Sequence, residues 1–270
     1  MGRERAQVLT SDEVEQFVSD GYVRLDEAFP RELAAQCRSL LWEETGCDPD
    51  DPATWTQPVV RIFGRSDEPF QRAAATQRLH AAFDQLVGRG RWIPRIGLGT
   101  FPIRFPHPDP PGDDGWHVDA GWHVAEDDPE FDWSRSADLD WAGYRLSVRS
   151  RGRALLMLFL FSDVGPLDAP TRIKVGSHLR LPALLAPHAD AGSASPDLPT
   201  LDDLTTVEAT GRAGDVYLCH PFVVHAAQAH RGSTPRFIAQ PPLLPTGGML
   251  DLDGAAATPV VRAIRAGLGT

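Results

Sequence analysis

The sequence predicts a mainly β protein in which helices precede the sheet. Amphipathic helical patterns occur in about the first 90 residues. From Trp92 onward, short runs rich in β-branched and aromatic residues are separated by clusters of Gly, Pro and Asp, a pattern typical of a β-sandwich or barrel. No repeat and no long low-complexity linker interrupts the chain. We therefore expect the 270 residues to form a single domain, with a helical part at about 1–90, a β core at about 91–245 and a C-terminal extension at 246–270.

The helical part contains three predicted helices. Thr10 to Glu13 reads as a capping box, which starts a helix that ends at Gly21. Pro30 can open a second helix that closes at Gly46, and residues 70–87 carry an apolar stripe at helical spacing. Residues 22–25 and 59–63 are predicted as strands between them.

The β core contains several strand candidates. Residues 154–161 are almost entirely apolar, which indicates a strand buried on both faces. The other expected strands cover residues 96–105 (interrupted by Pro102), 116–120, 144–148, 171–175, 216–220 with a continuation at 222–224, and 236–239. The acidic segment 127–142, with Trp133 and Trp141, suits a long loop or lid within 119–154, and 182–204 is expected to be irregular.

The amino-acid composition argues against some classes of binding partner. The formal net charge of −11 argues against nucleic acid and anionic membrane surfaces, which need a surplus of Lys and Arg. There is neither an apolar run of membrane-spanning length nor an apolar signal-peptide core at the N-terminus, and three cysteines without metal spacing fit a reducing compartment. We expect a cytoplasmic protein that acts on a small molecule.

One pair of residues suggests a metal site. If residues 116–120 form a strand, His117 and Asp119 project from the same face. With a second imidazole they would complete the 2-His-1-carboxylate set that holds Fe(II) and leaves open positions. The chain contains two further His-x-Asp triplets. His107 with Asp109 lies in a proline cluster, and His188 with Asp190 lies in a segment with no flanking strand, so neither is favoured.

The remaining ligand must come from farther along the chain. The candidates are His220, His225 and His230. The alternative for each is a core or surface histidine that is hydrogen-bonded to the backbone and binds no metal. His225 is preferred because it closes an apolar run and is followed by two small residues, which leave room for a metal. Arg236, eleven residues later on the next expected strand, could bind a carboxylate bidentately, as a dicarboxylic cosubstrate such as 2-oxoglutarate requires.

These residues together resemble the phytanoyl-CoA dioxygenase family of Fe(II)/2-oxoglutarate oxygenases. The resemblance spans about residues 10–240 and rests on the order of five motifs: residues 21–23, 117–119, 168–178, 214–218 leading to His225, and 235–236. It implies a double-stranded β-helix, or cupin-like jelly roll, for the core at about 91–245. It assigns His117, Asp119 and His225 to iron and Arg236 to the distal carboxylate of 2-oxoglutarate. The chain departs from the family's pattern at Ala227, where relatives often carry a hydroxyl, and in the long segment after Asp119.

The implied activity is oxidation of an unactivated C–H bond with Fe(II), 2-oxoglutarate and O₂. Hydroxylation of a bacterial secondary metabolite is the first expectation, with desaturation, epoxidation or rearrangement as alternatives on the same site. Because Asp119 fills the carboxylate position, no site is left for chloride, and halogenation is disfavoured. A metal enzyme or isomerase that uses no 2-oxoglutarate and a non-catalytic ligand-binding jelly roll remain as alternatives from other classes.

Four further residues are candidate contacts. Arg104, on the strand before His117 and Asp119, is a candidate for cosubstrate or substrate binding. The alternative is that it is an ordinary surface cation. Trp116, Trp122 and His123 flank the pair and are candidates for a substrate pocket, although aromatic residues there are as often packing. The sequence makes no prediction of oligomeric state.

Overall fold

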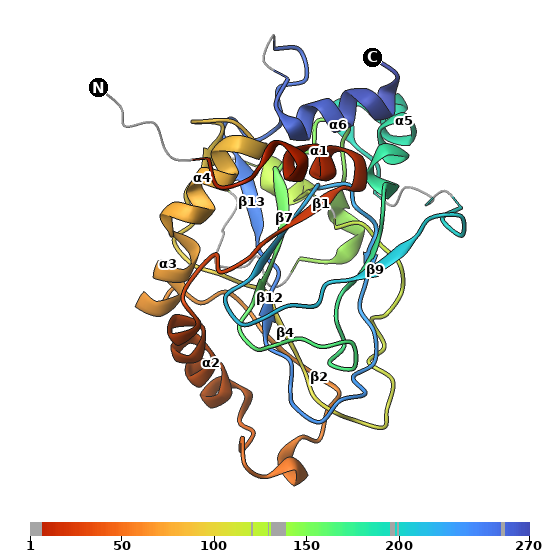
Figure 1. Ribbon diagram of the computed structural model, residues 1–270. Helices are drawn as coiled ribbons and strands as arrows, with labels where there is room; N and C mark the ends of the chain where they lie inside the picture. Colours follow the sequence, from red (N-terminus) through yellow and green to blue (C-terminus); the bar gives the residue numbers. More distant parts are fainter. Residues whose placement is uncertain are drawn as a thin grey trace.

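The computed structural model describes residues 7–270, except 120, 129, 131–138, 195–197, 199 and 255–256. Two antiparallel sheets form its centre, and helices cover the larger one on one face (Figure 1). The helices are α1 (Ser11–Asp20), α2 (Arg31–Thr45), α3 (Glu68–Ala74), α4 (Gln77–Leu86), α5 (Leu181–Leu185) and α6 (Pro259–Leu268). In the described part of the chain, no helix is both long and apolar enough to cross a bilayer.

The larger sheet has strand β7 (Leu155–Leu160) at its centre. Its order is β1-β10-β7-β13-β3, with β12 also paired to β7. These strands are β1 (Tyr22–Leu25), β10 (Val216–Cys219), β13 (Pro242–Pro245), β3 (Trp92–Ile93) and β12 (Ile238–Ala239). Every pairing is antiparallel. Each one joins strands that are far apart in the sequence.

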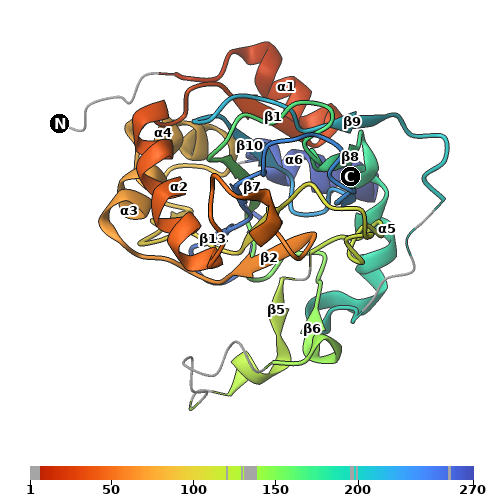
Figure 2. The same ribbon diagram turned by 90° about the horizontal axis from the view of Figure 1, so that it is seen from below.

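Three smaller sheets complete the β structure. The order β11-β8-β9 joins β11 (His225–Ala226), β8 (Arg172–Lys174) and β9 (Thr206–Glu208). Strand β2 (Val59–Ile62) pairs with β4 (Phe101–Arg104), and β5 (Trp122–His123) pairs with β6 (Tyr144–Arg145). Seen from below, β5 and β6 project away from the body of the molecule (Figure 2).

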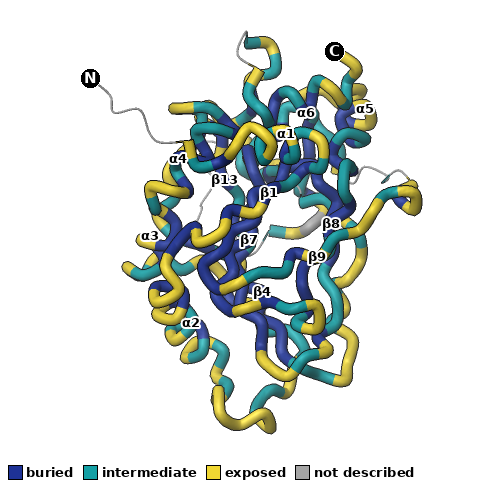
Figure 3. Tube along the Cα trace, in the orientation of Figure 1, coloured by how far each residue is buried: buried dark blue, intermediate teal, exposed yellow. Residues whose placement is uncertain are grey.

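Strand β7 separates two hydrophobic cores. All six of its residues are buried, as the sequence predicts. Side chains alternate across a strand, so Leu155, Met157 and Phe159 pack with the helices, and Leu156, Leu158 and Leu160 pack with residues of the second sheet such as Ile173. The buried stretches accordingly run through the middle of the molecule, under a more exposed layer of helices (Figure 3).

The N-terminal elements follow the sequence closely. The Thr10 hydroxyl accepts a hydrogen bond from the Glu13 amide, and the Glu13 carboxylate accepts one from the Thr10 amide, which completes the capping box of α1. Gly21 and Gly46 end α1 and α2 in the left-handed conformation. Residues 70–87 were expected as one helix, and this was wrong. The Thr76 hydroxyl donates to the Ala28 carbonyl and accepts from the Leu79 amide, so it ends α3 and caps α4.

Other expectations also need correction. A strand was expected at 116–120, but residues 116–119 do not form one: only His117 among them forms a bridge, and residue 120 lies outside the described residues. The segment 182–204 is not wholly irregular, because Pro182 lies in the first turn of α5, where proline is tolerated. Of the expected strand 144–148 only β6 forms, and of 96–105 only β4 forms, with Pro102 inside it. Residues 222–224 do not continue β10, because the chain turns at Pro221 and Phe222.

Helix α6 in the C-terminal extension was not anticipated. It starts at Pro259 and buries Val260, Val261, Ala263 and Ile264. Its partners are α1 and α5, which gather with it at the upper end of the molecule in Figure 1. A bidentate ion pair between Arg262 and Glu15 joins α6 to α1 on the surface. Segments near both ends of the chain therefore pack together.

Two buried histidines make the fold sensitive to acid. The rings of His178 and His220 lie 4.8 Å apart, and burial lowers the pKa of His178 to about 4. The unfolded chain therefore binds protons from about pH 6.5 downward that the folded state does not bind, and stability falls as the pH falls. Between pH 7 and pH 5 we expect His178 alone to cost about 2 kcal/mol of unfolding free energy.

Urea denaturation of metal-free protein at both pH values measures this loss. His178→Gln should reduce the pH-dependent loss by about 2 kcal/mol. His188→Gln, at an exposed position, should leave it unchanged. An identical loss in the His178 variant and the wild type would contradict the assignment.

Candidate metal and cosubstrate site

His117 and His225 are held together by their own backbones. The His117 amide donates to the His225 carbonyl (3.0 Å), and the His225 amide donates to the His117 carbonyl (2.9 Å). Residues paired in this way in antiparallel chains project to the same side. Their ring centroids accordingly lie 4.4 Å apart. A single bridge thus brings together two imidazoles that are more than one hundred residues apart in sequence.

Asp119 completes the cluster. Its Oδ1 atom lies 3.8 Å from Nε2 of His117 and 3.8 Å from Nε2 of His225. Among the described residues this is the one group of at least three His, Cys, Asp or Glu side chains whose ligand atoms come within metal-binding reach of one another. The structure thus brings together the three residues that the sequence singles out.

Both imidazoles direct Nε2 to the cluster and Nδ1 to a backbone carbonyl. Nδ1 of His117 lies 2.9 Å from the Gly115 carbonyl, and Nδ1 of His225 lies 3.2 Å from the Val223 carbonyl. A carbonyl only accepts, so each neutral ring carries its proton on Nδ1 and leaves the Nε2 lone pair free. Backbone carbonyls orient metal-binding histidines in this way in many proteins.

The charges suit a divalent cation. Burial lowers the pKa of His225 to about 4, so this imidazole is neutral at pH 7. Burial alone would raise the pKa of Asp119, but Arg153 in the first place, and then the two histidines, hold it below its ordinary value. A neutral imidazole and an ionised carboxylate are the forms that bind metal.

The other candidate histidines bind backbone instead. His220 has Nε2 at 3.2 Å from the Val260 carbonyl and accepts from the Phe222 amide at Nδ1. His230 likewise meets the Thr234 carbonyl and the Gly232 amide. With both ring nitrogens occupied, neither is available to a metal. The triplets at His107 and His188 take no part in the cluster.

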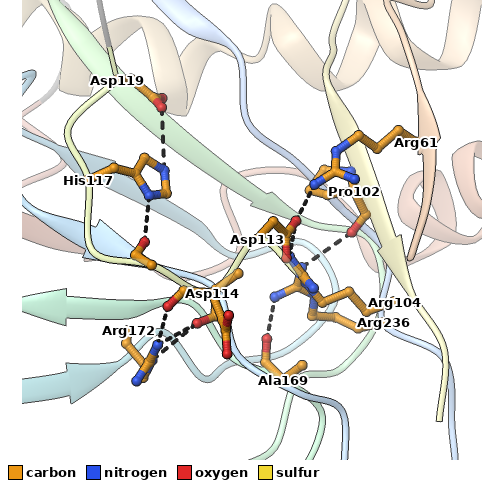
Figure 4. A network of polar contacts seen from close by, with 12 residues as sticks. Arg61, Pro102, Arg104, Asp113, Asp114, His117, Asp119, Ala169, Arg172 and Arg236 are labelled. Atoms are coloured by element: carbon orange, nitrogen blue, oxygen red, sulfur yellow. Dashed lines mark hydrogen bonds and ion pairs between the residues drawn. The ribbon is translucent and has the colours of Figure 1, made fainter. Parts of the chain in front are cut away.

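Two buried arginines lie in the same region as the cluster of His117, Asp119 and His225. Arg104 and Arg236 are paired through reciprocal backbone hydrogen bonds, and they are 2% and 1% exposed. The Arg236 side chain donates to the carbonyls of Ala169 and Pro102. In Figure 4 the two guanidinium groups are neighbours. Their Nε atoms and Nη1 of Arg104 are buried and have no hydrogen-bond partner in the described part of the molecule.

This pair carries more positive charge than its surroundings neutralise. Asp113 accepts two hydrogen bonds of 2.8 Å from Arg104 and also pairs with Arg61. Among the described residues, Arg236 has no ion-pair partner. Burial and the neighbouring Arg104 lower the pKa of Arg236 below its ordinary value. An uncompensated buried cation is costly, so the arrangement suits the binding of an anion such as a carboxylate.

The loop 113–115 lies between Arg104 and the three-residue cluster and contacts both. Asp113 binds Arg104, the Gly115 carbonyl meets His117, and the Asp114 carbonyl accepts from Arg172 at 2.8 Å (Figure 4). Arg172 also donates to the Ala227 carbonyl, two residues after His225. One side chain on β8 therefore ties both histidine-bearing segments in place.

The candidate substrate residues lie elsewhere. The Trp116 ring lies under Arg172 (4.8 Å) and Lys174 (5.0 Å). His225 pairs with Ile173, so these two cations project from the opposite face of β8 to the His225 ring. Trp122 and His123 are buried in the β5–β6 hairpin, Trp122 against Arg151 and His123 against Tyr144. Trp133 lies outside the described residues.

Three polar residues near the site were not anticipated from the sequence: Asp113, Arg153 and Arg172. Asp113 lies only four residues before His117, but an acidic residue next to a proline-rich loop is too common to be a signal. The two arginines gain their roles from contacts with residues far away in the sequence.

The chain is similar to known proteins in sequence and in fold. A family model described as phytanoyl-CoA dioxygenase matches residues 17–238. No curated protein sequence shows a significant match to the chain.

Several solved structures share the fold at low sequence identity. The 2-oxoglutarate-dependent epimerase SnoN from nogalamycin biosynthesis is 18% identical, with a TM-score of 0.54 over 85% of this chain and 80% of its own. HygX from Streptomyces hygroscopicus with nickel and 2-oxoglutarate is 21% identical, with a TM-score of 0.52 over 86% and 85%. EctD from S. alaskensis with bound Fe is 18% identical, with a TM-score of 0.57 over 93% and 82%.

Removing one ligand should abolish tight metal binding. In anaerobic titrations with Fe(II), Asp119→Ala and His225→Ala should raise the Kd by more than about 100-fold, because losing a ligand exceeds the effect of losing an outer partner. His107→Gln, in one of the other His-x-Asp triplets, should bind as the wild type does. Unchanged affinity in both ligand variants would show that the metal binds elsewhere.

Proposed function

Since this chain belongs to the phytanoyl-CoA dioxygenase family and is an enzyme that uses Fe(II), 2-oxoglutarate and O₂, we propose that it hydroxylates an unactivated C–H bond of a small molecule. We further propose that its two main antiparallel sheets form a double-stranded β-helix and that the chain is a single oxygenase domain. The convergence of His117, Asp119 and His225 carries the proposal.

In this proposal, His117, Asp119 and His225 hold the iron. The donor set fits Fe(II), because two imidazoles and one carboxylate leave positions open on the metal. When the rings are neutral, the backbone carbonyls of Gly115 and Val223 place each ring proton on Nδ1 and leave Nε2 free for the metal. Asp119 supplies the third ligand and so fills the carboxylate position that a halide would otherwise take.

Arg236 and Arg104 would bind the distal carboxylate of 2-oxoglutarate. Two observations support this assignment: the buried guanidinium nitrogens without partners, and a positive charge that Asp113 only partly neutralises. A dicarboxylic cosubstrate would supply the missing acceptors and charge. Ala227 provides no hydroxyl here, so anchoring depends on the arginines, and the backbone at Ala227 is instead bound by Arg172.

The iron and 2-oxoglutarate, when bound, supply the O₂-dependent oxidation of the substrate. The protein's own side chains position and shield them. The apolar residues between the two sheets, including Leu158, Ile173 and Val223, exclude water from the inner side of the site. The neutral His225 and the ionised Asp119 need no proton transfer before they bind the metal at neutral pH.

We propose a secondary metabolite as the substrate. Support comes from structures of the same fold: SnoN is named for nogalamycin biosynthesis, and HygX comes from a Streptomyces species. Desaturation, epoxidation and rearrangement remain alternatives that use the same residues. Part of the segment in which a lid was expected, residues 129 and 131–138, lies outside the described residues.

Turnover tests this proposal directly. With Fe(II), O₂ and a panel of secondary metabolites, the wild type should convert 2-oxoglutarate to succinate and add one oxygen atom to a substrate, as seen by mass spectrometry. A loss of two hydrogens would indicate desaturation, and a mass-neutral product would indicate rearrangement. Epoxidation also adds one oxygen atom, so the NMR spectrum of an oxygenated product separates an epoxide from an alcohol. Asp119→Ala should form no succinate, and succinate formation at wild-type rate in this variant would refute the site.

Anchoring by Arg236 can be tested without turnover. Under anaerobic conditions, the charge-transfer absorption of the Fe(II) and 2-oxoglutarate complex reports cosubstrate binding. Arg236→Ala should raise the Kd for 2-oxoglutarate by at least about 30-fold, since truncating one partner of a buried charge pair costs about 2 kcal/mol or more.

Pyruvate provides the control ligand, because it has a 2-oxo acid but no distal carboxylate. Arg236→Ala and the wild type should bind pyruvate equally. Arg31→Ala, which breaks an exposed ion pair with Asp163, should bind both acids as the wild type does. Equal weakening of both acids in Arg236→Ala would contradict the assignment to the distal carboxylate.

A further inference from the structure

The two carboxylate oxygens of Asp119 face different partners. Oδ1 lies 3.8 Å from each of the two histidine Nε2 atoms. Oδ2 lies 3.3 Å from Nη1 of Arg153. Oδ1 is therefore directed to the two histidines and Oδ2 to Arg153.

Arg153 is mounted on a fixed turn directly before β7. The Ser150 hydroxyl donates to the Arg153 carbonyl at 2.6 Å, and the Arg153 amide donates to the Ser150 carbonyl. The next residue, Ala154, donates to the Leu243 carbonyl on β13 at 2.6 Å. The backbone of Arg153 is held on both sides, so its side chain starts from a defined position.

The Arg153 side chain has little other than Asp119 to bind. It is 11% exposed, and its Nε and Nη1 atoms are buried without a hydrogen-bond partner among the described residues. Asp119 is the carboxylate within ion-pair distance of it in the part of the chain that the structure describes. The nearby Arg95 is a second cation and cannot neutralise it. An ordinary stabilising ion pair would be expected to show better hydrogen bonding of a cation this buried.

We propose that Arg153 is a positioning residue that keeps Oδ2 of Asp119 away from the metal, so that the carboxylate binds iron through Oδ1 alone. The inference rests on the proposed iron site. Binding through one oxygen leaves three positions open on a six-coordinate metal, whereas binding through both would occupy one of them. Arg153 thus preserves the coordination space that the cosubstrate and O₂ require.

Metal affinity and coordination test this inference without turnover. Two neutral replacements, Arg153→Gln and Arg153→Met, are compared with the wild type in anaerobic Fe(II) titrations, and circular dichroism identifies which of them is folded. We expect the Kd to rise by about 10- to 100-fold, the usual effect of losing an outer partner of a ligand. With Co(II) in place of Fe(II), the visible spectrum should also change, because it depends on coordination number.

Two further variants give the experiment its specificity. Arg153→Lys keeps the charge and should recover most of the affinity and the wild-type Co(II) spectrum. Arg151→Gln is the matched control, because Arg151 lies on the same turn and pairs with Asp127 and Trp122 rather than with the metal cluster. It should behave as the wild type does.

The outcomes separate this inference from the proposed function. If the wild type binds Fe(II) and loses it in Asp119→Ala, the metal site stands. Wild-type affinity and spectrum in a folded neutral Arg153 variant would then overturn the positioning role alone. Equal weakening in Arg151→Gln would also overturn it, since the effect would belong to the turn. A wild type that binds no Fe(II) would overturn both proposals.

Discussion

The pairing of His117 with His225 is the interaction on which the rest of the site depends. Two backbone hydrogen bonds place both rings on one side, and two more, from each Nδ1 to a nearby carbonyl, fix which nitrogen faces the cluster. Main-chain groups therefore set the position of both imidazole rings and the ring nitrogen that carries the proton when each ring is neutral. The ladder of strands around β8 and β11 supports this pairing from one side.

Positive charge is arranged around the cluster in separate places. Arg104 and Arg236 lie together on β4 and beside β12, Arg153 stands at the start of β7, and Arg172 lies on β8. Arg104 and Arg236 form the proposed carboxylate-binding site, Arg153 contacts one oxygen of Asp119, and Arg172 binds the backbone of both histidine segments. Asp113 and its neighbours in the loop 113–115 connect the first and last of these. In a protein with net charge −11, such a local excess of cations points to the binding of small anions.

Local signals in the sequence were enough for much of the fold. The capping box at Thr10, the glycines that end α1 and α2, and the apolar run of β7 all act over a few residues, and the structure confirms them. The split between α3 and α4 could not be predicted, because Thr76 finds its partner at Ala28, far away in the sequence. The cluster of His117, Asp119 and His225 was predicted from neighbouring residue types and family resemblance. The contacts of Asp113, Arg153 and Arg172 depend on tertiary structure, which no local pattern contains.

The separation of His117 from His225 along the chain also bears on how the protein folds. A pairing of such high contact order forms late, after the intervening strands have closed a long loop. The proposed ligand set is therefore not assembled in partly folded chains. A metal ion that binds only the native arrangement adds its binding free energy to the stability of the whole fold. Metal occupancy would then depend on the native topology of the whole chain, and depletion of the metal would lower the free energy of unfolding as well as stop the chemistry.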